Sequence, residues 1–257
     1  MTAQPVQVNA AVPATAPLTN VTMFMQLIVQ LQNRAFHLPG LGVFYGPSGY
    51  GKTCSAVYGA NKSGAYYVEV GASWGPSTMV DAIYHELTGL VMKGTIAVKV
   101  AEIIRLLADD NRPLIIDEAD HLIKKVMIDV VREISDKSAS PVILIGEEQL
   151  PEKLLPFERA HNRVFAWVAA QPVNVADAAA LASLYAPNIT IAVDLIEHVV
   201  GLTDGVTRRV VINLERIKEF AMERGLTHID LGNWENQRIY NGRPLPRPRQ
   251  PRVKVAS

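Results

Sequence analysis

The segment from Gly46 to Thr53, GPSGYGKT, constrains the fold of this chain more than any other stretch. It matches the phosphate-binding loop pattern GxxxxGK[ST] at every required position. The apolar run LGVFY precedes it and predicts a buried strand, and a helical pattern follows it. A chance glycine-rich turn is the alternative, but a strand before the loop and a helix after it favour an α/β domain with a parallel sheet.

The chemistry of this loop predicts nucleotide binding. Its glycines let backbone N–H groups close around a polyphosphate, and the start of the following helix adds positive potential. Lys52 is expected to reach the β- and γ-phosphates and Thr53 to ligate Mg²⁺, so ATP and Mg²⁺ are the predicted cofactors. Cys54 is expected to be a small buried side chain. The nucleotide-binding residues predicted here are Gly46, Pro47, Ser48, Gly49, Tyr50, Gly51, Lys52, Thr53 and Cys54.

Apolar runs that alternate with helical stretches continue this pattern to about residue 171. Strands are predicted at 41–45, 65–70, 113–117, 141–146 and 164–170, and helices at 21–31, 78–87, 97–108, 122–136 and 151–161. Nearly continuous apolar strands are typical of a parallel sheet that is covered on both faces. The predicted fold class is therefore α/β, with a doubly wound, parallel, five-stranded sheet.

Two adjacent carboxylates, Asp117 and Glu118, end the predicted strand PLII. A carboxylate at a strand tip beside the loop can hold the Mg²⁺ shell, and a second one can orient and deprotonate an attacking water. An acidic helix start is the alternative. Hydrolysis, as opposed to nucleotide binding alone, depends on Glu118.

The letters Asp-Glu-Ala-Asp at 117–120 also name a class of RNA helicases, but the rest of the chain does not fit that class. With 257 residues it is too short for two motor domains, and the Ser-Ala-Thr motif expected after the next strand is missing. Asp120 and His121 are instead expected to begin a helix, where an acidic residue suits the positive end of the helix dipole.

After residue 171 the strand pattern stops, and helices are predicted at 175–185, 191–200 and 206–224, with Gly225 as a C-cap. The predicted domains are an uncharged, disordered lead at 1–19, the nucleotide-binding α/β domain at 20–171, a small helical lid at 172–232 and a basic, proline-rich tail at 233–257.

The overall charge and the cysteine content say little about function, and only the tail has a clear charge bias. Lys and Arg total 25, as do Asp and Glu, but from position 236 onward every charge is positive. The single cysteine fits a reducing cytoplasm. The first twenty residues lack the features of a signal peptide, and the run at 21–31 is too short to cross a membrane.

In its layout the chain resembles the AAA+ ATPases, and within them the DNA transposition ATPases of Mu-like phages and their relatives in Tn7-like and IS21-like elements. The stretches that carry this resemblance are VFYGPSGYGKT, YYVEVGASWGPSTMVDAIYHELTG, LIIDEADHL, VVREISDKSASPVILIG and GVTRRVVINLERI. The resemblance implies an ATPase that oligomerises on double-stranded DNA as a ring or filament, selects a transposition target and delivers it to a transposase.

The same resemblance implies further residue roles. Arg208, three residues after Gly205 in the lid signature, would contact the γ-phosphate, and Arg163 or Arg159 would be the arginine finger of a neighbouring subunit. Glu147 stands where the family usually has Asn, Thr or Ser, so it receives no catalytic role. The residues implied for phosphate contacts with DNA are Lys93, Lys99 and Arg105.

Two other functions stay open at this point. One is a helicase loader or another replication-type ATPase, which would bind single strands and a hexameric helicase. The other is a scaffold or secretion-type ATPase without a nucleic-acid partner.

Overall fold

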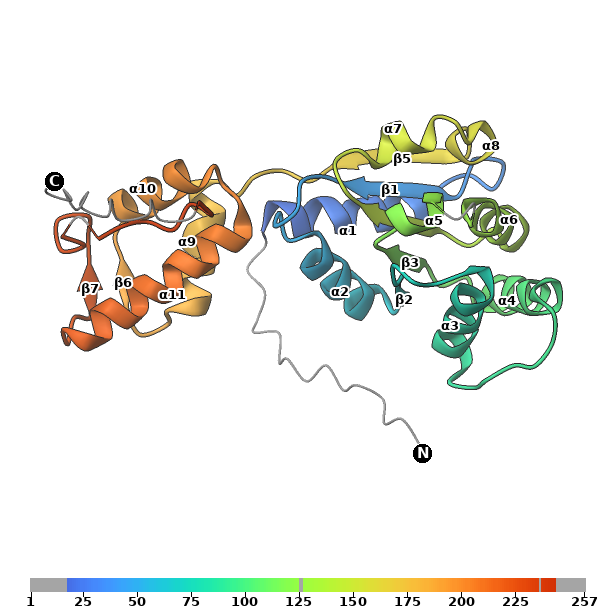
Figure 1. Cartoon of the computed structure of the whole chain (residues 1–257), viewed down its shortest axis with the longest axis horizontal. Helices are drawn as coiled ribbons and strands as arrows, with labels where there is room; N and C mark the ends of the chain where they lie inside the picture. The colour runs from blue at the N-terminus through green and yellow to red at the C-terminus, as the bar shows by residue number, and fades with distance from the viewer. Residues whose placement is uncertain (1–17, 125–126, 236, 244–257) are drawn as a thin grey trace, which may run out of the picture.

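The structure, a computed structural model, describes residues 18–124, 127–235 and 237–243. Figure 1 shows two bodies joined by a linker, a larger α/β domain and a smaller, mostly helical second domain. The chain enters the α/β domain through α1 (Thr19–Gln32) and passes into the second domain after β5 (Val164–Ala169). Most of the predicted lead lies outside the described residues.

The α/β domain is built on a five-stranded sheet of order β2-β3-β4-β1-β5 in which every pair is parallel. This confirms the predicted fold class. The four other strands are β1 (Leu41–Tyr45), β2 (Tyr66–Glu69), β3 (Leu114–Asp117) and β4 (Val142–Gly146). Because all five run in the same direction, their carboxyl ends meet at one edge of the sheet, which brings the loops that follow β1 and β3 to the same edge, on either side of β4.

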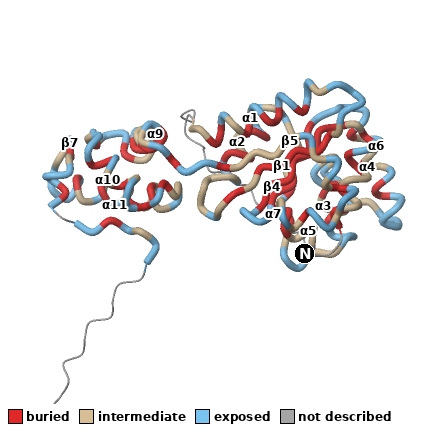
Figure 2. The backbone as a smooth tube through the Cα atoms, turned by 90° about the horizontal axis from the view of Figure 1, so that it is seen from above, coloured by how far each residue is buried: buried red, intermediate tan, exposed pale blue. Residues whose placement is uncertain are grey.

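Alternation along the strands explains why their sequences are apolar at nearly every position. Ile115 of β3 belongs to a core with Phe24 of α1 and Ala56 of α2 (Lys52–Ser63). Its neighbours Leu114 and Ile116 belong to the core on the other face. That face is covered by α3 (Pro76–Thr88), α4 (Ile96–Asp110) and α6 (Ile128–Ser138). Figure 2 shows the central strands buried between these layers.

The second domain has a core of its own. It contains α9 (Val175–Tyr185), α10 (Val193–Thr203), α11 (Thr207–Glu223) and a short parallel pair, β6 (Thr190–Ile191) with β7 (His228–Ile229). Trp234 and Ile239, both placed in the tail by the sequence, are buried in this core. The predicted tail therefore begins inside the second domain, and its residues from 244 onward lie outside the described part of the chain.

Two segments that were each predicted as one continuous helix are each divided into two helices. The segment predicted as one helix at 122–136 covers the end of α5 (Asp120–Lys124) and most of α6, and the segment at 151–161 covers most of α7 (Leu150–Leu154) and all of α8 (Glu158–His161). Pro156 accounts for the second break, because proline lacks the N–H that a continuous helix needs. Among the described residues, no helix is both long and apolar enough to cross a bilayer.

Candidate functional site

The loop Gly46–Thr53 connects the end of β1 to the start of α2 at the carboxyl edge of the sheet. Gly49 and Gly51 have φ values of +86° and +78°, a region that side chains disfavour, so glycine is required for this path. Gly51 is also the N-cap of α2, and the first N–H groups of the helix therefore face the loop. This arrangement suits the binding of a polyphosphate.

Lys52 lies over the loop that it follows. Its Nζ donates hydrogen bonds to the carbonyl oxygens of Gly46, at 2.7 Å, and Pro47, at 2.9 Å. Burial lowers the pKa of Lys52, and the nearby carboxylates of Asp117 and Glu118 act in the opposite direction. Lys52 is thus positioned to place its positive charge against anionic oxygens in the loop.

Asp117 ends β3 and is only 3% exposed. Its Oδ2 accepts hydrogen bonds from the Thr53 hydroxyl, at 2.8 Å, and the Tyr67 hydroxyl, at 3.0 Å. Thr53 and Asp117 are hard oxygen donors that converge beside the loop, which is the chemistry that Mg²⁺ prefers. The residues predicted as metal ligands therefore fit that ion.

Tyr67 was missed by the sequence analysis. It lies on β2, the strand next to β3, and no local motif marks it. Burial, together with the negative charge of Asp117, raises the pKa of Tyr67 far above its usual range. The phenol therefore stays protonated and remains a hydrogen-bond donor to Asp117.

Glu118 follows in an unusual backbone conformation, with φ at +55°. Such a value is strained for a residue with a side chain, and strain of this kind clusters at functional sites. The residue is exposed overall, yet partial desolvation of its carboxyl group raises the pKa of Glu118, and the neighbouring Asp117 adds to the rise. A carboxylate of this kind at the mouth of the site suits a general base.

The second domain reaches the loop through the start of α11. The backbone N–H of Arg208 donates to the carbonyl oxygen of Gly49 at 3.0 Å. A side chain at Gly49 would meet Val206 at 3.0 Å and Arg208 at 3.5 Å, so glycine permits this close approach. The Arg208 side chain is exposed and begins beside the loop; its contact with a bound phosphate stays a prediction.

Asp120 and Glu147 lie beside the site but belong to a structural cluster. As expected, Asp120 begins a helix, α5. Its buried carboxylate accepts hydrogen bonds from the backbone N–H of Glu147 and from Lys153 Nζ, both at 2.6 Å. Lys153 also contacts the Glu147 carboxylate at 3.1 Å. This cluster fixes the segment that follows β4.

The two candidate finger arginines are remote from the loop of their own chain. Arg159 is an exposed residue of α8. Arg163 is exposed just before β5, at the amino edge of the sheet, and pairs with Asp136 at 3.2 Å. The phosphate-binding loop lies at the opposite, carboxyl edge. Either arginine could therefore act only on a site in another subunit.

The three predicted DNA-contacting residues differ in how available their charges are. Lys93 is exposed in the connection between α3 and α4. Arg105 is exposed but pairs with Glu102 and Asp109, both at 2.7 Å. Lys99 is only 7% exposed and pairs with Asp81 at 2.5 Å. Lys93 is thus the best placed of the three to meet a DNA phosphate.

Cys54 is exposed, which corrects the expectation of a buried side chain. It lies on the outer surface of the first turn of α2 and close enough to Tyr185 of α9 to interact with it electrostatically.

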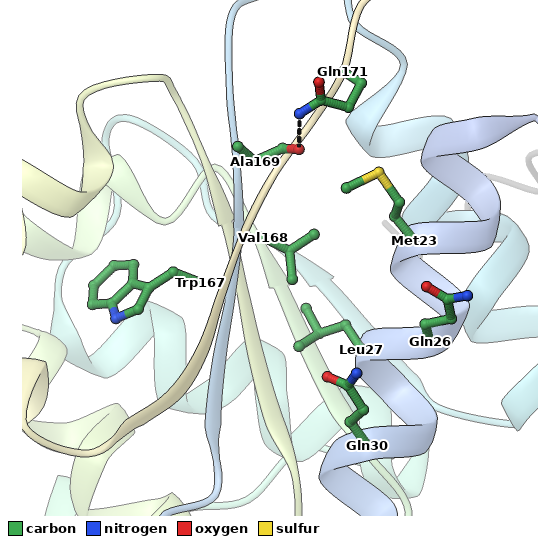
Figure 3. A pocket seen from close by; sticks show the side chains of 8 residues that line it. All are labelled: Met23, Gln26, Leu27, Gln30, Trp167, Val168, Ala169 and Gln171. Atoms are coloured by element: carbon green, nitrogen blue, oxygen red, sulfur yellow. Dashed lines mark hydrogen bonds between the residues drawn. The ribbon is translucent and has the colours of Figure 1, made fainter.

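Two hollows in the described part of the chain lie away from the phosphate-binding loop. One lies between α1 and β5 (Figure 3), with a volume of about 290 Å³, and another of about 580 Å³ lies beside α4 and α6.

Residues 34–154 match a protein-family model described as "AAA domain", which covers most of the α/β domain. This segment is therefore similar to the AAA domains that the model describes. The match includes the phosphate-binding loop and the Asp117–Glu118 pair, so the family and the site geometry agree. No curated protein matches the sequence.

Solved structures with the same fold include two ORC proteins of Aeropyrum pernix. The ORC2 protein of Aeropyrum pernix, solved in ADPNP and ADP complexes, has a TM-score of 0.66 and 13% identity, covering 86% of this chain and 67% of that one. The ORC1 protein of the same organism, solved in complex with DNA, has a TM-score of 0.56 and 18% identity, covering 83% and 62%. A Walker-type ATPase of Pyrococcus abyssi has a TM-score of 0.58 and 13% identity, covering 80% and 67%.

At these identities the likeness establishes the fold alone, an α/β domain with a five-stranded parallel sheet followed by C-terminal helices. This chain spans about two thirds of the length of those proteins.

Proposed function

We propose that this protein is an ATPase that binds Mg²⁺-ATP at the Gly46–Thr53 loop and assembles on DNA in its ATP-bound state. The observation that carries the proposal is the convergence on one loop of Lys52, Thr53, Asp117 and Glu118 from the AAA domain, together with Arg208 from the second domain. A structural relative solved with ADPNP and ADP adds support.

Each of these residues has a separate task in the proposed reaction. The loop N–H groups and Lys52 hold the phosphates, and Arg208 adds a positive charge from the second domain. Thr53 and Asp117 would hold Mg²⁺, which supplies charge neutralisation when bound. Glu118 orients the attacking water and accepts its proton, and Tyr67 keeps the Asp117 carboxylate in place.

The positions of the two arginines are consistent with the proposed oligomer. Arg159 and Arg163 lie away from the loop of their own chain, so either can complete a site only across a subunit boundary. We expect that mixing Arg163→Ala protein with Lys52→Ala protein restores part of the hydrolysis, because a mixed interface can combine an intact loop with an intact arginine. If Arg159→Ala is rescued in this way and Arg163→Ala is not, the finger is Arg159.

For the cellular role, the ORC-like fold favours a replication-type ATPase. One of these relatives was solved in complex with DNA. The second candidate, a transposition ATPase that delivers a DNA target to a transposase, is supported by the sequence stretches around the loop, the Asp117–Glu118 pair and Gly205. Both roles require ATP-dependent binding to DNA, whereas a scaffold or secretion-type ATPase does not.

A DNA-binding assay with and without ATP separates these functions. Duplex and single-stranded DNA are each titrated with the protein, and Lys52→Ala, which lacks the charge that offsets the phosphates, serves as the matched control. A preference for single strands supports the replication-type role, and ATP-dependent duplex binding supports target delivery. Equal binding with and without ATP would remove the proposed ATP switch.

A further inference from the structure

Asn20, in the first turn of α1, is a buried polar residue with a relative exposure of 7%. Its Nδ2 donates to the carbonyl oxygens of Tyr50, at 2.9 Å, and Gln171, at 2.8 Å. Its Oδ1 accepts from the backbone N–H of Gln171 at 2.8 Å. Both N–H bonds of the amide and its oxygen are therefore engaged, which is uncommon for a side chain with a purely space-filling role.

These partners belong to two separate functional segments. Tyr50 lies inside the phosphate-binding loop, between Gly49 and Gly51, whereas Gln171 lies in the linker between β5 and the second domain. One side chain thus joins α1 to positions 30 and 151 residues away. In Figure 3, Gln171 lies at one end of the groove between α1 and β5, with its side-chain amide bonded to the Ala169 carbonyl.

Neighbouring contacts strengthen the connection to the second domain. The backbone N–H of Thr19 donates to Asp177 at 2.9 Å, and Asn174 donates to the Thr19 hydroxyl at 3.3 Å. Asn174 and Asp177 form the capped start of α9. The first turn of α1 is therefore attached to the phosphate-binding loop, to the linker and to the first helix of the second domain.

The hydrogen bond to Tyr50 bears directly on phosphate binding. A trans peptide is planar, so its carbonyl and N–H point in opposite directions. By holding the Tyr50 carbonyl, Asn20 fixes the orientation of the Gly51 N–H on the other side of the same peptide. The preceding carbonyl, that of Gly49, is held by the N–H of Arg208 from the second domain. Two consecutive peptides of the loop are thus held from two elements.

We propose that Asn20 is a positioning residue that couples the orientation of the second domain to the conformation of the phosphate-binding loop. The inference rests on the proposed ATP-binding function and specifies how the second domain and the linker respond to nucleotide. A movement of Gln171 strains the Asn20 amide and, through it, the Tyr50–Gly51 peptide. Conversely, a nucleotide that orders the loop also orders the linker.

The test compares Asn20→Ala and Asn20→Asp with the parent protein. Alanine removes the three hydrogen bonds, whereas aspartate keeps the size and the acceptor but places a carboxylate oxygen against two carbonyl oxygens. Both variants should bind ATP on the order of tenfold more weakly, because buried carbonyls are left unsatisfied or repelled. The KM for ATP should rise in the same proportion with a smaller change in kcat, since Asp117 and Glu118 are untouched. Asn33→Ala, at the exposed C-cap of the same helix, is the matched control and should behave as the parent.

Hydrogen exchange at saturating ATP provides a readout that a general loss of stability would not reproduce. In the parent, ATP should protect both the loop and the linker at 170–177, whereas in the variants it should protect the loop but not the linker. If Asn20→Ala does not fold, as judged by circular dichroism, Asn20→Asp carries the same test because it preserves volume. Linker protection and ATP affinity equal to the parent in a folded variant would overturn the coupling. Failure of the parent itself to bind ATP would instead overturn the proposed function.

Discussion

The α/β domain and the second domain contribute to the candidate site in different ways. The α/β domain supplies side chains from its strands and from the phosphate-binding loop: Asp117 ends β3, Tyr67 lies on the adjacent β2, and the loop after β1 carries Lys52 and Thr53. The second domain makes its contact through the backbone of α11, where the Arg208 N–H meets the Gly49 carbonyl.

The α/β domain therefore carries the catalytic groups, and the second domain helps to position the loop. The carboxylates are held by a sheet that is buried on both faces, so their relative geometry is set by strand register and does not depend on the second domain. The contacts of the second domain pass through a linker and a few hydrogen bonds, which can change with nucleotide state at small energetic cost. Changes in the first group should therefore alter catalysis, and changes in the second should alter affinity and domain coupling.

The largest effect is expected from Glu118→Gln, which removes the proposed base while keeping size and hydrogen-bonding capacity. ATP should bind and the protein should assemble on DNA as the parent does, but hydrolysis should slow by at least about a hundredfold. Steady-state ATP turnover and nucleotide binding, measured on the same preparation, check this. If hydrolysis releases the assembly, DNA complexes of the variant should also persist after excess ATP is removed.

Glu147→Gln is the matched control, because Glu147 is an exposed carboxylate near the site that contacts Lys153. It should hydrolyse ATP at close to the parental rate. Normal turnover in Glu118→Gln would make the base assignment wrong, and slow turnover with rapid DNA release would break only the link between hydrolysis and disassembly.

An intermediate effect is expected at Gly205, in the turn between α10 and α11 that packs against the linker. Its φ is +63°, and an added Cβ would lie 2.7 Å from the carbonyl oxygen of Val173. Gly205→Ala should destabilise the protein by about 1–3 kcal/mol through backbone strain. The residues that follow Gly205 contact the phosphate-binding loop. If a free-energy cost of this size also falls on the ATP-bound state, ATP should bind on the order of tenfold more weakly. Thermal unfolding and an ATP titration measure the two effects.

Gly201→Ala is the opposite case in the same domain. Gly201 lies within α10, and an added Cβ there has no neighbour within 4 Å. Alanine should stabilise the helix by about 0.5–1 kcal/mol, since glycine is the poorer helix former. A stability loss of equal size in both variants would mean that the backbone conformation and close contacts of Gly205 are not what limits its replacement.

The sequence predicted the sheet well because its signal is local. Buried parallel strands must be apolar on both faces, and each predicted strand lies within one residue of the observed one. The helices at 122–136 and 151–161 were predicted as continuous because apolar periodicity persists across their breaks. The placement of Trp234 and Ile239 in the core of the second domain was missed because nearby arginines and prolines dominate the composition there.

The candidate site was predictable where a residue type has a fixed place in a motif, as for Lys52, Thr53 and Asp117. Tyr67 and Asn20 could not be found in this way, because their partners lie on elements that are distant in sequence. The same limit applies to Lys99, since helical spacing cannot show that Asp81 of α3 lies opposite.

The smallest effect is expected from Tyr67→Phe. This prediction concerns only the α/β domain. The change removes one hydroxyl that donates to Asp117, while the Thr53 hydroxyl and the Glu118 N–H still donate to the same carboxylate. Losing one of three donors to a charged group should weaken but not abolish its orientation. We therefore expect the Mg²⁺ concentration for half-maximal hydrolysis to rise by about threefold, with kcat at saturating Mg²⁺ nearly unchanged.

The adjacent Tyr66→Phe supplies the control, because its hydroxyl donates to Asp110 on α4, away from the site. Nucleotide binding measured across a Mg²⁺ titration should shift for Tyr67→Phe and stay in place for Tyr66→Phe. An equal shift in both variants would mean that the strand as a whole, and not the Tyr67 hydroxyl, supports the carboxylate. A lower kcat at saturating Mg²⁺ would mean that Tyr67 acts in the chemical step as well. Separate outcomes for two neighbouring tyrosines on one strand would show that the metal side of this site is set by individual donors to Asp117.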